Sequence, residues 1–283
     1  MTTDQTEITI YKMQGSGNDF VCMNNNQVRL PETKMPIWAR RICRRSFGVG
    51  ADGLIFLEDA PDNEGIHYRW HFYNADGSRA EMCGNGSRCA ARLAHRLGMA
   101  PANHVLGTDA GPVQAVVDEK NQEVQVQLTA PHSFSSDLDL SLDSGRAVTV
   151  HMVNTGVPHV VYFSDQADRE DILELGPALR YHQHFAPAGA NVNIVHIQDA
   201  NSLYVRTYER GVEDETYACG TGAAAAAFVA SKLGLCGNPV RVRTSGGEEL
   251  GISISGDDIY LQGQAILVYT AQLILQAVGL EQR

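Results

Sequence analysis

Two stretches of the sequence place a cysteine directly before a glycine-rich turn and a run of small residues. Cys83 begins Cys-Gly-Asn-Gly-Ser-Arg-Cys-Ala-Ala, and Cys219 begins Cys-Gly-Thr-Gly-Ala-Ala-Ala-Ala. Glycines permit a tight turn and a close approach of the backbone to a ligand. A helix that starts at such a turn exposes unpaired N–H groups, with about half a positive charge at its N-terminus. This field suits a bound carboxylate and favours thiolate over thiol, so both cysteines are predicted to be reactive.

Two thiols that face one bound carboxylate indicate a particular reaction. Inverting the α-carbon of an amino acid requires one base to remove the proton and one acid on the opposite face to return it. A thiol with a pKa of about 8.5 can take either role near neutral pH. The N–H groups of both helices would stabilise the carbanion that forms. The pattern therefore predicts proton transfer at an α-carbon, with Cys83 and Cys219 as acid and base.

Pyridoxal phosphate is the usual alternative for such an inversion. It needs a lysine for its Schiff base and a cradle for its phosphate. The chain has four lysines, and none lies in the two cysteine motifs: Lys12, Lys34, Lys120 and Lys232. We therefore expect no organic cofactor.

Other patterns in the sequence do not support a nucleotide or metal site. Gly48–Gly53 matches the GxGxxG pattern, but a helix-like segment precedes it and a strand follows, the reverse of a dinucleotide fold. His182 and His184 lack the further ligands of a metal site, and we expect them in a solvated loop. The chain has no CxxC pair. Four cysteines are expected to be small buried side chains: Cys22, Cys43, Cys89 and Cys236.

The two cysteine motifs are part of an internal repeat. Four pairs of segments occur in the same order and at similar spacings in both halves: Ser16–Val21 with Thr155–Val160, Gly50–Ile55 with Ala190–Val195, Tyr73-Asn74 with Tyr208-Glu209, and Cys83–Gly86 with Cys219–Gly222. The repeat predicts two homologous domains. Pro131 and the Ser/Asp-rich stretch 133–144 favour a boundary that gives domains 1–130 and 131–269.

Hydrophobic periodicity and turn residues predict a mixture of helices and strands. Strands are expected at 7–12, 20–24, 54–57, 68–73, 113–117 and 124–128, and helices at 36–45, 86–97 and 270–278. The last pair of strands should form a hairpin. The C-terminal segment 270–283 is expected to pack back on the first domain.

The composition excludes some classes of partner. The 33 acidic and 22 basic residues give a formal net charge of −11, which argues against nucleic acid and anionic membrane surfaces. We expect no export signal, because the sequence does not begin with a basic segment followed by an apolar run. The uncharged run 259–280 contains four glutamines, which favours a strand and a helix over a membrane span. Six scattered cysteines favour free thiols in a reducing cytoplasm.

Six motifs together resemble the diaminopimelate epimerase family: Gly15–Phe20, Asn74–Ser78, Cys83–Cys89, Pro158-His159, Tyr208–Gly211 and Ala218–Gly222. The resemblance covers nearly the whole chain. It implies an α/β (α+β) fold of two pseudo-symmetric domains, each a mixed-strand barrel around a central helix, with the active site in the cleft between them. It also implies interconversion of LL- and meso-2,6-diaminopimelate for lysine and peptidoglycan precursors, without metal or organic cofactor, by a cytoplasmic homodimer.

The resemblance also implies roles for individual residues. Cys83 and Cys219 are similar to the acid/base thiols of the family. The implied substrate contacts are Asn18, Asn74, Gly84, Asn85, Asn193, Glu209, Arg210, Gly220 and Thr221, with His159 in a supporting position. The turns Gly84-Asn85 and Gly220-Thr221 would hold the reacting carboxylate. Arg210 would bind the distal carboxylate through two parallel hydrogen bonds.

Two departures from the family pattern leave alternatives open. Some members have Gln in place of Gly53 and Asn in place of Val157, which affects the distal end of the substrate. A racemase of proline or histidine type has a similar fold and cysteine pair. A thiol redox or binding protein, with a functional disulfide between Cys83 and Cys219, is an alternative of a different class.

Overall fold

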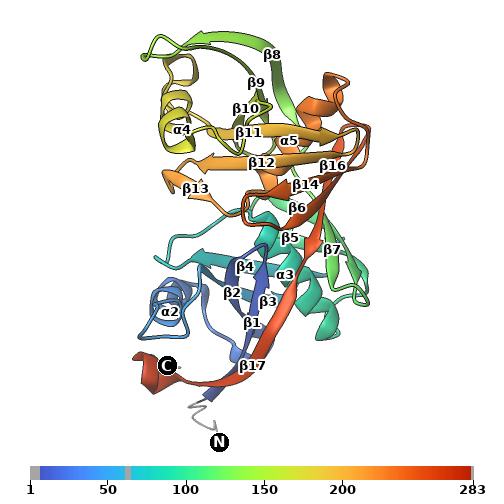
Figure 1. Cartoon of the computed structure of the whole chain (residues 1–283). Helices are drawn as coiled ribbons and strands as arrows, with labels where there is room; N and C mark the ends of the chain where they lie inside the picture. Colours follow the sequence, from blue (N-terminus) through green and yellow to red (C-terminus); the bar gives the residue numbers. More distant parts are fainter. Residues whose placement is uncertain (1–6, 61–64, 282–283) are drawn as a thin grey trace, which may run out of the picture. The chain divides into compact units, whose positions relative to one another are not determined.

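The computed structural model describes residues 7–60 and 65–281, which divide into two compact units. The first unit takes Met1–Val126 and Gln264–Arg283, and the second takes Gln127–Gly263. Figure 1 shows the last strand, β17 (Ile266–Ile274, red), beside the first strand, β1 (Glu7–Gly15, blue). These two strands pair in antiparallel fashion, so the end of the chain belongs to the same unit as its beginning.

The first unit combines eight strands with helices on both sides of its sheet. Besides β1 and β17 it contains β2 (Asn18–Asn24), α1 (Asn25–Val28), α2 (Met35–Ile42), β3 (Gly53–Asp59), β4 (Tyr68–Asn74), α3 (Gly84–Arg96), β5 (Asn103–Thr108), β6 (Gly111–Asp118) and β7 (Glu123–Gln127). The strands pair in the order β17-β1-β2-β3-β4-β5-β6-β7. Only the β2–β3 and β4–β5 pairs among these are parallel.

The second unit has the same pattern of strand pairing. Its elements are β8 (His132–Ser141), β9 (Ala147–Asn154), β10 (Pro158–Phe163), α4 (Ile172–Arg180), β11 (Asn191–Asp199), β12 (Ser202–Glu209), β13 (Asp214–Thr216), α5 (Gly220–Lys232), β14 (Val240–Thr244), β15 (Glu249–Ser255) and β16 (Asp258–Gln264). The strands pair in the order β8-β9-β10-β11-β12-β14-β15-β16. As in the first unit, the third and the fifth strand of this order are each parallel to the strand that follows, in the pairs β10–β11 and β12–β14. β13 is an addition, antiparallel to β12.

The helices that follow the two cysteines are the most buried elements of their units. α3 packs on β1, β2, β3, β6 and β17, and α5 packs on β9, β10, β11, β12, β14 and β15. Every residue of α5 from Gly222 to Ala230 is buried, and five of them are consecutive alanines. Small side chains let the helix backbone lie close to the surrounding strands. Each cysteine is thereby placed at the N-terminal end of a helix inside its own unit.

The registers of the strands correct one part of the predicted repeat. Phe20 of β2 pairs with Gly53, and His159, its counterpart on β10, pairs with Asn191. Gly53 therefore corresponds to Asn191, whereas the sequence alignment had matched Gly53 with Asn193. A shift of two residues leaves side chains on the same face of a strand, so hydrophobic patterning alone does not distinguish the two registers.

One prediction of secondary structure was wrong. The predicted helix 270–278 is the second half of β17 followed by a 3₁₀ turn at Leu275–Val278. Eight residues of β1 pair with β17, and these tertiary hydrogen bonds override the local preference. The Ser/Asp-rich stretch at the predicted domain boundary lies mostly in β8, an exposed strand with two register shifts. No helix within residues 7–60 and 65–281 is both long and apolar enough to cross a membrane.

Candidate active site

Cys83 is the N-cap residue of α3. Its backbone is extended (φ −153°, ψ 117°), and its Sγ accepts a hydrogen bond from Gly86 N at 3.4 Å. Its carbonyl oxygen accepts from Ser87 N at 2.8 Å, as the first bond of the helix. The thiol sulfur therefore lies among the free N–H groups of the first turn, where the helix dipole favours negative charge.

Asn18 lies beside Cys83 in the first unit. The Cys83 Sγ is 3.8 Å from Asn18 Oδ1, and Asn18 Nδ2 donates to Asp52 Oδ2 at 2.6 Å. Asp52 also accepts from Asp19 N at 3.2 Å, which fixes the start of β2. The structure thus brings two predicted site residues together and adds Asp52, which the sequence analysis missed. Asp52 belongs to the GxGxxG segment set aside as a nucleotide motif.

Ionic contacts secure the strand that carries Asn18. Asp19 pairs with Lys12 and, at 3.1 Å, with Arg45 Nη2. Burial alone would raise the pKa of Asp19, but the Lys12 and Arg45 charges hold it below its usual value. The charged network therefore persists at neutral pH.

Asn74 and Asn85 are the other predicted contacts of the first unit. Asn74, at the end of β4, donates through Nδ2 to Ser78 Oγ at 3.0 Å and pairs with Gly53 across the strands. Asn85 is buried in the first turn of α3, and its Oδ1 has no hydrogen-bond partner among the described residues. A buried polar atom of this kind is a candidate for a ligand contact.

The position of Gly53, where some relatives carry Gln, is filled by a neighbouring ring. A Cβ at Gly53 would lie 2.5 Å from Phe72 Cε2 and 3.0 Å from Tyr73 O. Phe72 is buried and stacks edge-on against Phe20 with ring centroids 5.8 Å apart. Aromatic packing therefore fills the space beside Gly53.

Cys219 is the N-cap residue of α5, with a similar extended backbone (φ −119°, ψ 108°). Its Sγ lies 3.4 Å from Thr221 Oγ1, and its carbonyl oxygen accepts from Ala223 N at 2.9 Å. Thr155 Oγ1 donates to the carbonyl of Thr221 at 2.9 Å and ties the β9–β10 turn to the helix start. The turn Gly220-Thr221 is thus held in place within the second unit.

His159 and Asn193 form a buried polar cluster below this turn. Both are fully buried, and Asn193 Nδ2 donates to Val160 O at 2.9 Å and to His159 Nδ1 at 3.2 Å. Asn193 Oδ1 accepts from Thr207 Oγ1 at 3.0 Å. Burial, assisted by the charge of Arg210, lowers the pKa of His159 to about 3, so its ring is neutral. Both amide atoms of Asn193 are engaged inside the unit, which does not favour it as a substrate contact.

Asn191, rather than Asn193, contacts the segment that carries Glu209 and Arg210. Its Oδ1 accepts from Arg210 N at 2.8 Å, and its Nδ2 donates to Pro158 O at 3.5 Å. The guanidinium of Arg210 donates only a long bond, 3.5 Å, to Ala188 O. Burial raises the pKa of Glu209. The sequence offered one indication of Asn191, since it is an asparagine two residues before Asn193, the predicted contact.

The remaining cysteines have surroundings unlike those of the two helix caps. Cys22 is fully buried and burial raises its pKa, while burial raises the pKa of Cys43 to about 12. Such thiols stay protonated and are poor nucleophiles. The described residues contain no group of three His, Cys, Asp or Glu side chains that could hold a metal ion.

Comparisons with known proteins agree on one family. The family model described as diaminopimelate epimerase matches residues 10–133 and 151–268. The diaminopimelate epimerase of Hydrogenobaculum sp. is 45% identical over 274 residues, which cover 93% of this chain and 98% of the relative. The corresponding protein of Aquifex aeolicus is 42% identical over 272 residues, with coverages of 93% and 96%.

Solved structures with little sequence identity share the fold. A hydroxyproline epimerase from Agrobacterium vitis superposes with a TM-score of 0.71 at 14% identity, covering 96% of this chain and 93% of that chain. A PhzF-family phenazine biosynthesis protein from Bacillus anthracis gives a TM-score of 0.67 at 16% identity, covering 94% and 99%. The fold is thus the mixed α/β fold, rich in strands, that these proteins have in common.

Proposed function

The chain belongs to the diaminopimelate epimerase family, and we propose that Cys83 and Cys219 carry out the proton transfer of its reaction. The protein is an isomerase that epimerises diaminopimelate in lysine biosynthesis. The observation that supports the two residues is their shared place: each caps the N-terminus of a buried helix in its own unit.

The mechanism follows from the positions of the two thiols. One cysteine, as thiolate, removes the α-proton of LL-diaminopimelate, and the other, as thiol, delivers a proton to the opposite face. The reverse reaction exchanges the two roles. The negative charge that spreads onto the α-carboxylate is stabilised by the N–H groups of the first turns of α3 and α5. The reaction therefore requires both thiols to reach the same α-carbon.

We propose that polar residues of both units hold the rest of the substrate. Gly84-Asn85 and Gly220-Thr221 bind the reacting carboxylate, and Asn18 and Asn74 line the site in the first unit. In the second unit Asn191 replaces Asn193 as the contact from β11, because Asn191 holds the Arg210 backbone. Arg210 binds the distal carboxylate and Glu209 binds the distal ammonium. His159 supports the Gly220-Thr221 turn.

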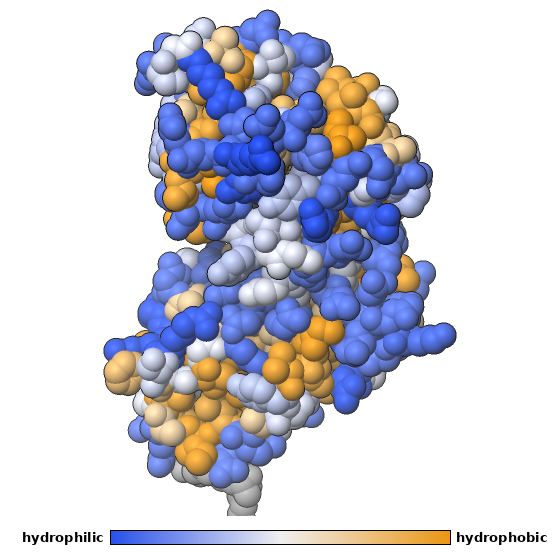
Figure 2. All heavy atoms as spheres, in the orientation of Figure 1, coloured by the Kyte–Doolittle hydropathy of each residue, from blue (hydrophilic) through white to orange (hydrophobic). Residues whose placement is uncertain are grey.

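Two further features are part of the proposal. The two units are copies of one ancestral domain, which their identical strand pairing supports. The protein is a cytoplasmic homodimer, as its six free cysteines suit a reducing compartment. Figure 2 shows hydrophobic residues on the first unit over β17 and α2, and Val268 and Ile274 of β17 are more than half exposed. This surface would be covered by the second copy.

The first prediction concerns the two thiols. Cys83→Ala and Cys219→Ala should each lower kcat for LL-diaminopimelate by at least about a thousandfold, because one of the two proton-transfer groups is lost. Epimerisation in D₂O, followed by mass spectrometry, measures turnover as deuterium at the α-carbon. Cys236→Ala is the matched control, since this half-buried cysteine lies outside both motifs and should leave the rate unchanged.

Two other results would contradict the proposed mechanism or the proposed substrate. Full turnover by either alanine variant would refute the two-thiol mechanism. Faster turnover of proline or histidine than of diaminopimelate would refute the substrate but leave the mechanism standing.

A further inference from the structure

A polar cavity lies on the face of the second unit's sheet that points away from α5. It has a volume of about 480 Å³, within the range of small-ligand pockets, and is lined by Asp165, Asp168, His196, Gln198, Tyr204, Arg243, Thr244, Ser245 and Gly247. His196, Tyr204 and Arg243 are cross-strand neighbours on β11, β12 and β14. Their sequence neighbours Val195, Leu203 and Val242 are buried on the α5 side, so this row faces outward.

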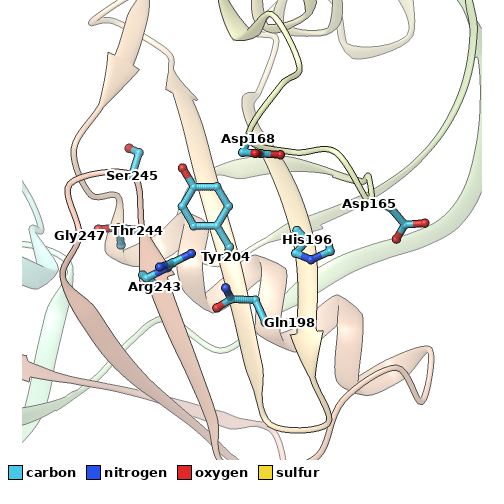
Figure 3. Close-up of a pocket in the computed structure, with 9 residues that line it drawn as sticks. All are labelled: Asp165, Asp168, His196, Gln198, Tyr204, Arg243, Thr244, Ser245 and Gly247. Atoms are coloured by element: carbon cyan, nitrogen blue, oxygen red, sulfur yellow. The ribbon is translucent and has the colours of Figure 1, made fainter.

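The lining places opposite charges on two sides of the cavity. Figure 3 shows Arg243 and Tyr204 on one side, Asp165 on the other, and His196 between them. The Arg243 guanidinium lies 5.1 Å from the centre of the Tyr204 ring, a contact that orients its plane. It forms no ion pair with any residue that the structure describes. Arg243 is therefore available to a ligand carboxylate.

Both walls of the cavity are held by hydrogen bonds within the unit. Arg206 donates to the carbonyls of Ala167 and Glu170 at 3.0 and 2.8 Å, which fixes the loop bearing Asp165 and Asp168. Opposite, Ser245 Oγ donates to Thr216 O at 3.1 Å, and Gly246 N donates to Tyr217 O at 3.0 Å. The charged groups thus stand on a preformed frame, which lowers the ordering cost of binding.

Two buried polar atoms of the lining, His196 Nδ1 and Thr244 Oγ1, have no hydrogen-bond partner among the described residues. Both atoms are shielded from solvent. Leaving such an atom unsatisfied is unfavourable, because the atom has lost its hydrogen bonds to water. A polar ligand in the cavity could satisfy them.

The fold itself does not require this cavity, because the first unit fills the equivalent place. There Arg69 and Gly107 pair as Tyr204 and Arg243 do. A Cβ at Gly107 would lie only 2.7 Å from Ile66 Cδ1, so the Ile66 side chain occupies the space. The first unit therefore has the Ile66 side chain at the place where the second unit has open space beside Arg243.

We propose that this cavity binds a small diamino monocarboxylic acid. Arg243 takes the carboxylate, and Asp168 and Asp165 take the two ammonium groups. The two carboxylates and one guanidinium of the lining leave one negative charge, which a ligand with two amines and one carboxylate balances. None of the lining residues belongs to the two cysteine motifs, and the inference does not depend on the function proposed above.

L-Lysine and two compounds of similar shape test the proposal by isothermal titration calorimetry of the whole chain. L-Norleucine lacks the second ammonium group, and cadaverine lacks the carboxylate. Lysine should bind at least tenfold more tightly than either. Arg243→Gln and Asp168→Asn should each weaken lysine binding at least tenfold. Arg241→Gln, on the same strand but outside the lining, should not change it.

The variants also separate this cavity from the catalytic site. Arg243→Gln should keep the epimerase activity and the melting temperature of the unmodified chain, which shows that it remains folded. Absence of lysine binding, equal binding of the three compounds, or an unchanged lysine Kd in Arg243→Gln and Asp168→Asn would each overturn the proposal.

Discussion

Cys83 and Cys219 occupy the same position in their helices but have different neighbours. Cys83 accepts a hydrogen bond from the helix and lies near the amide oxygen of Asn18. Cys219 has no such capping bond and instead lies beside the hydroxyl of Thr221. The halves of the site are therefore alike in backbone and distinct in side chains. Such a difference suits a substrate whose two faces present different groups to the two thiols.

The buried ring of His159 should make the stability of the protein depend on pH. Its pKa is lowered from 6.5 to about 3, so the unfolded chain binds a proton below pH 6.5 that the folded chain does not. Above pH 6.5 the ring is neutral in both states and the free energy of unfolding is at its full value. As the pH falls from 6.5 towards 3, the free energy of unfolding decreases. The loss should approach about 1.4 kcal/mol per pH unit in that window.

Urea unfolding between pH 7 and pH 5 measures this dependence. His159→Asn keeps an acceptor for Asn193 and removes the titrating ring, so its stability should fall less steeply with decreasing pH than that of the unmodified chain. His132→Asn changes an exposed histidine and should keep the original slope. Equal slopes for all three chains would show that His159 is not held neutral by burial.

At the scale of helices and strands, the sequence correctly predicted the elements that local signals such as turn residues determine. Both buried helices, the hairpin β6–β7 and the early strands followed from turn residues and periodicity. The end of the chain did not, because the apolar run in β17 is compatible with helix or strand, and pairing with β1 decides. The sequence could not separate Asn191 from Asn193 for a similar reason, since only strand register distinguishes them.

The two helix starts differ in how tightly they require glycine. A Cβ at Gly222 would overlap Asn193 Oδ1 and lie 3.2 Å from Thr207 Oγ1, whereas at Gly86 the nearest contacts are 3.4 and 3.5 Å. Gly222→Ala should therefore destabilise the protein by about 1–3 kcal/mol, because Asn193 has no space in which to move. Gly86→Ala, at the matching position of α3, should cost less than about 1 kcal/mol. Thermal and urea unfolding of both variants measure the difference.

A double variant tests the cause of that difference. If the overlap with Asn193 is responsible, Gly222→Ala should cost much less in an Asn193→Ala background. If the stability costs of the two substitutions are additive, then the strain does not come from contact between the added methyl group and Asn193.

At the scale of the whole molecule, the repeat explains how one cysteine can come from each unit. The strands of both units pair in the same order and directions, and each cysteine caps the helix that this sheet encloses. A duplicated frame of this kind supplies two similar acid/base groups. The proposed reaction needs them on opposite faces of one carbon, which requires the two helix N-termini to converge.

Oxidation of the substrate-free protein tests whether the two helix N-termini converge. If both sulfur atoms reach one α-carbon, then the two thiols should come close enough for a disulfide, whose Cβ···Cβ distance is about 3.5–4.5 Å. Mild oxidation should link Cys83 to Cys219 and abolish epimerisation, and a reductant should restore it. Peptide mass spectrometry identifies the link, and Cys236→Ala should still form it. Loss of activity while both thiols stay free would contradict convergence, because a disulfide would then not be the cause. Bound diaminopimelate should protect the pair, since the substrate would separate the two sulfurs.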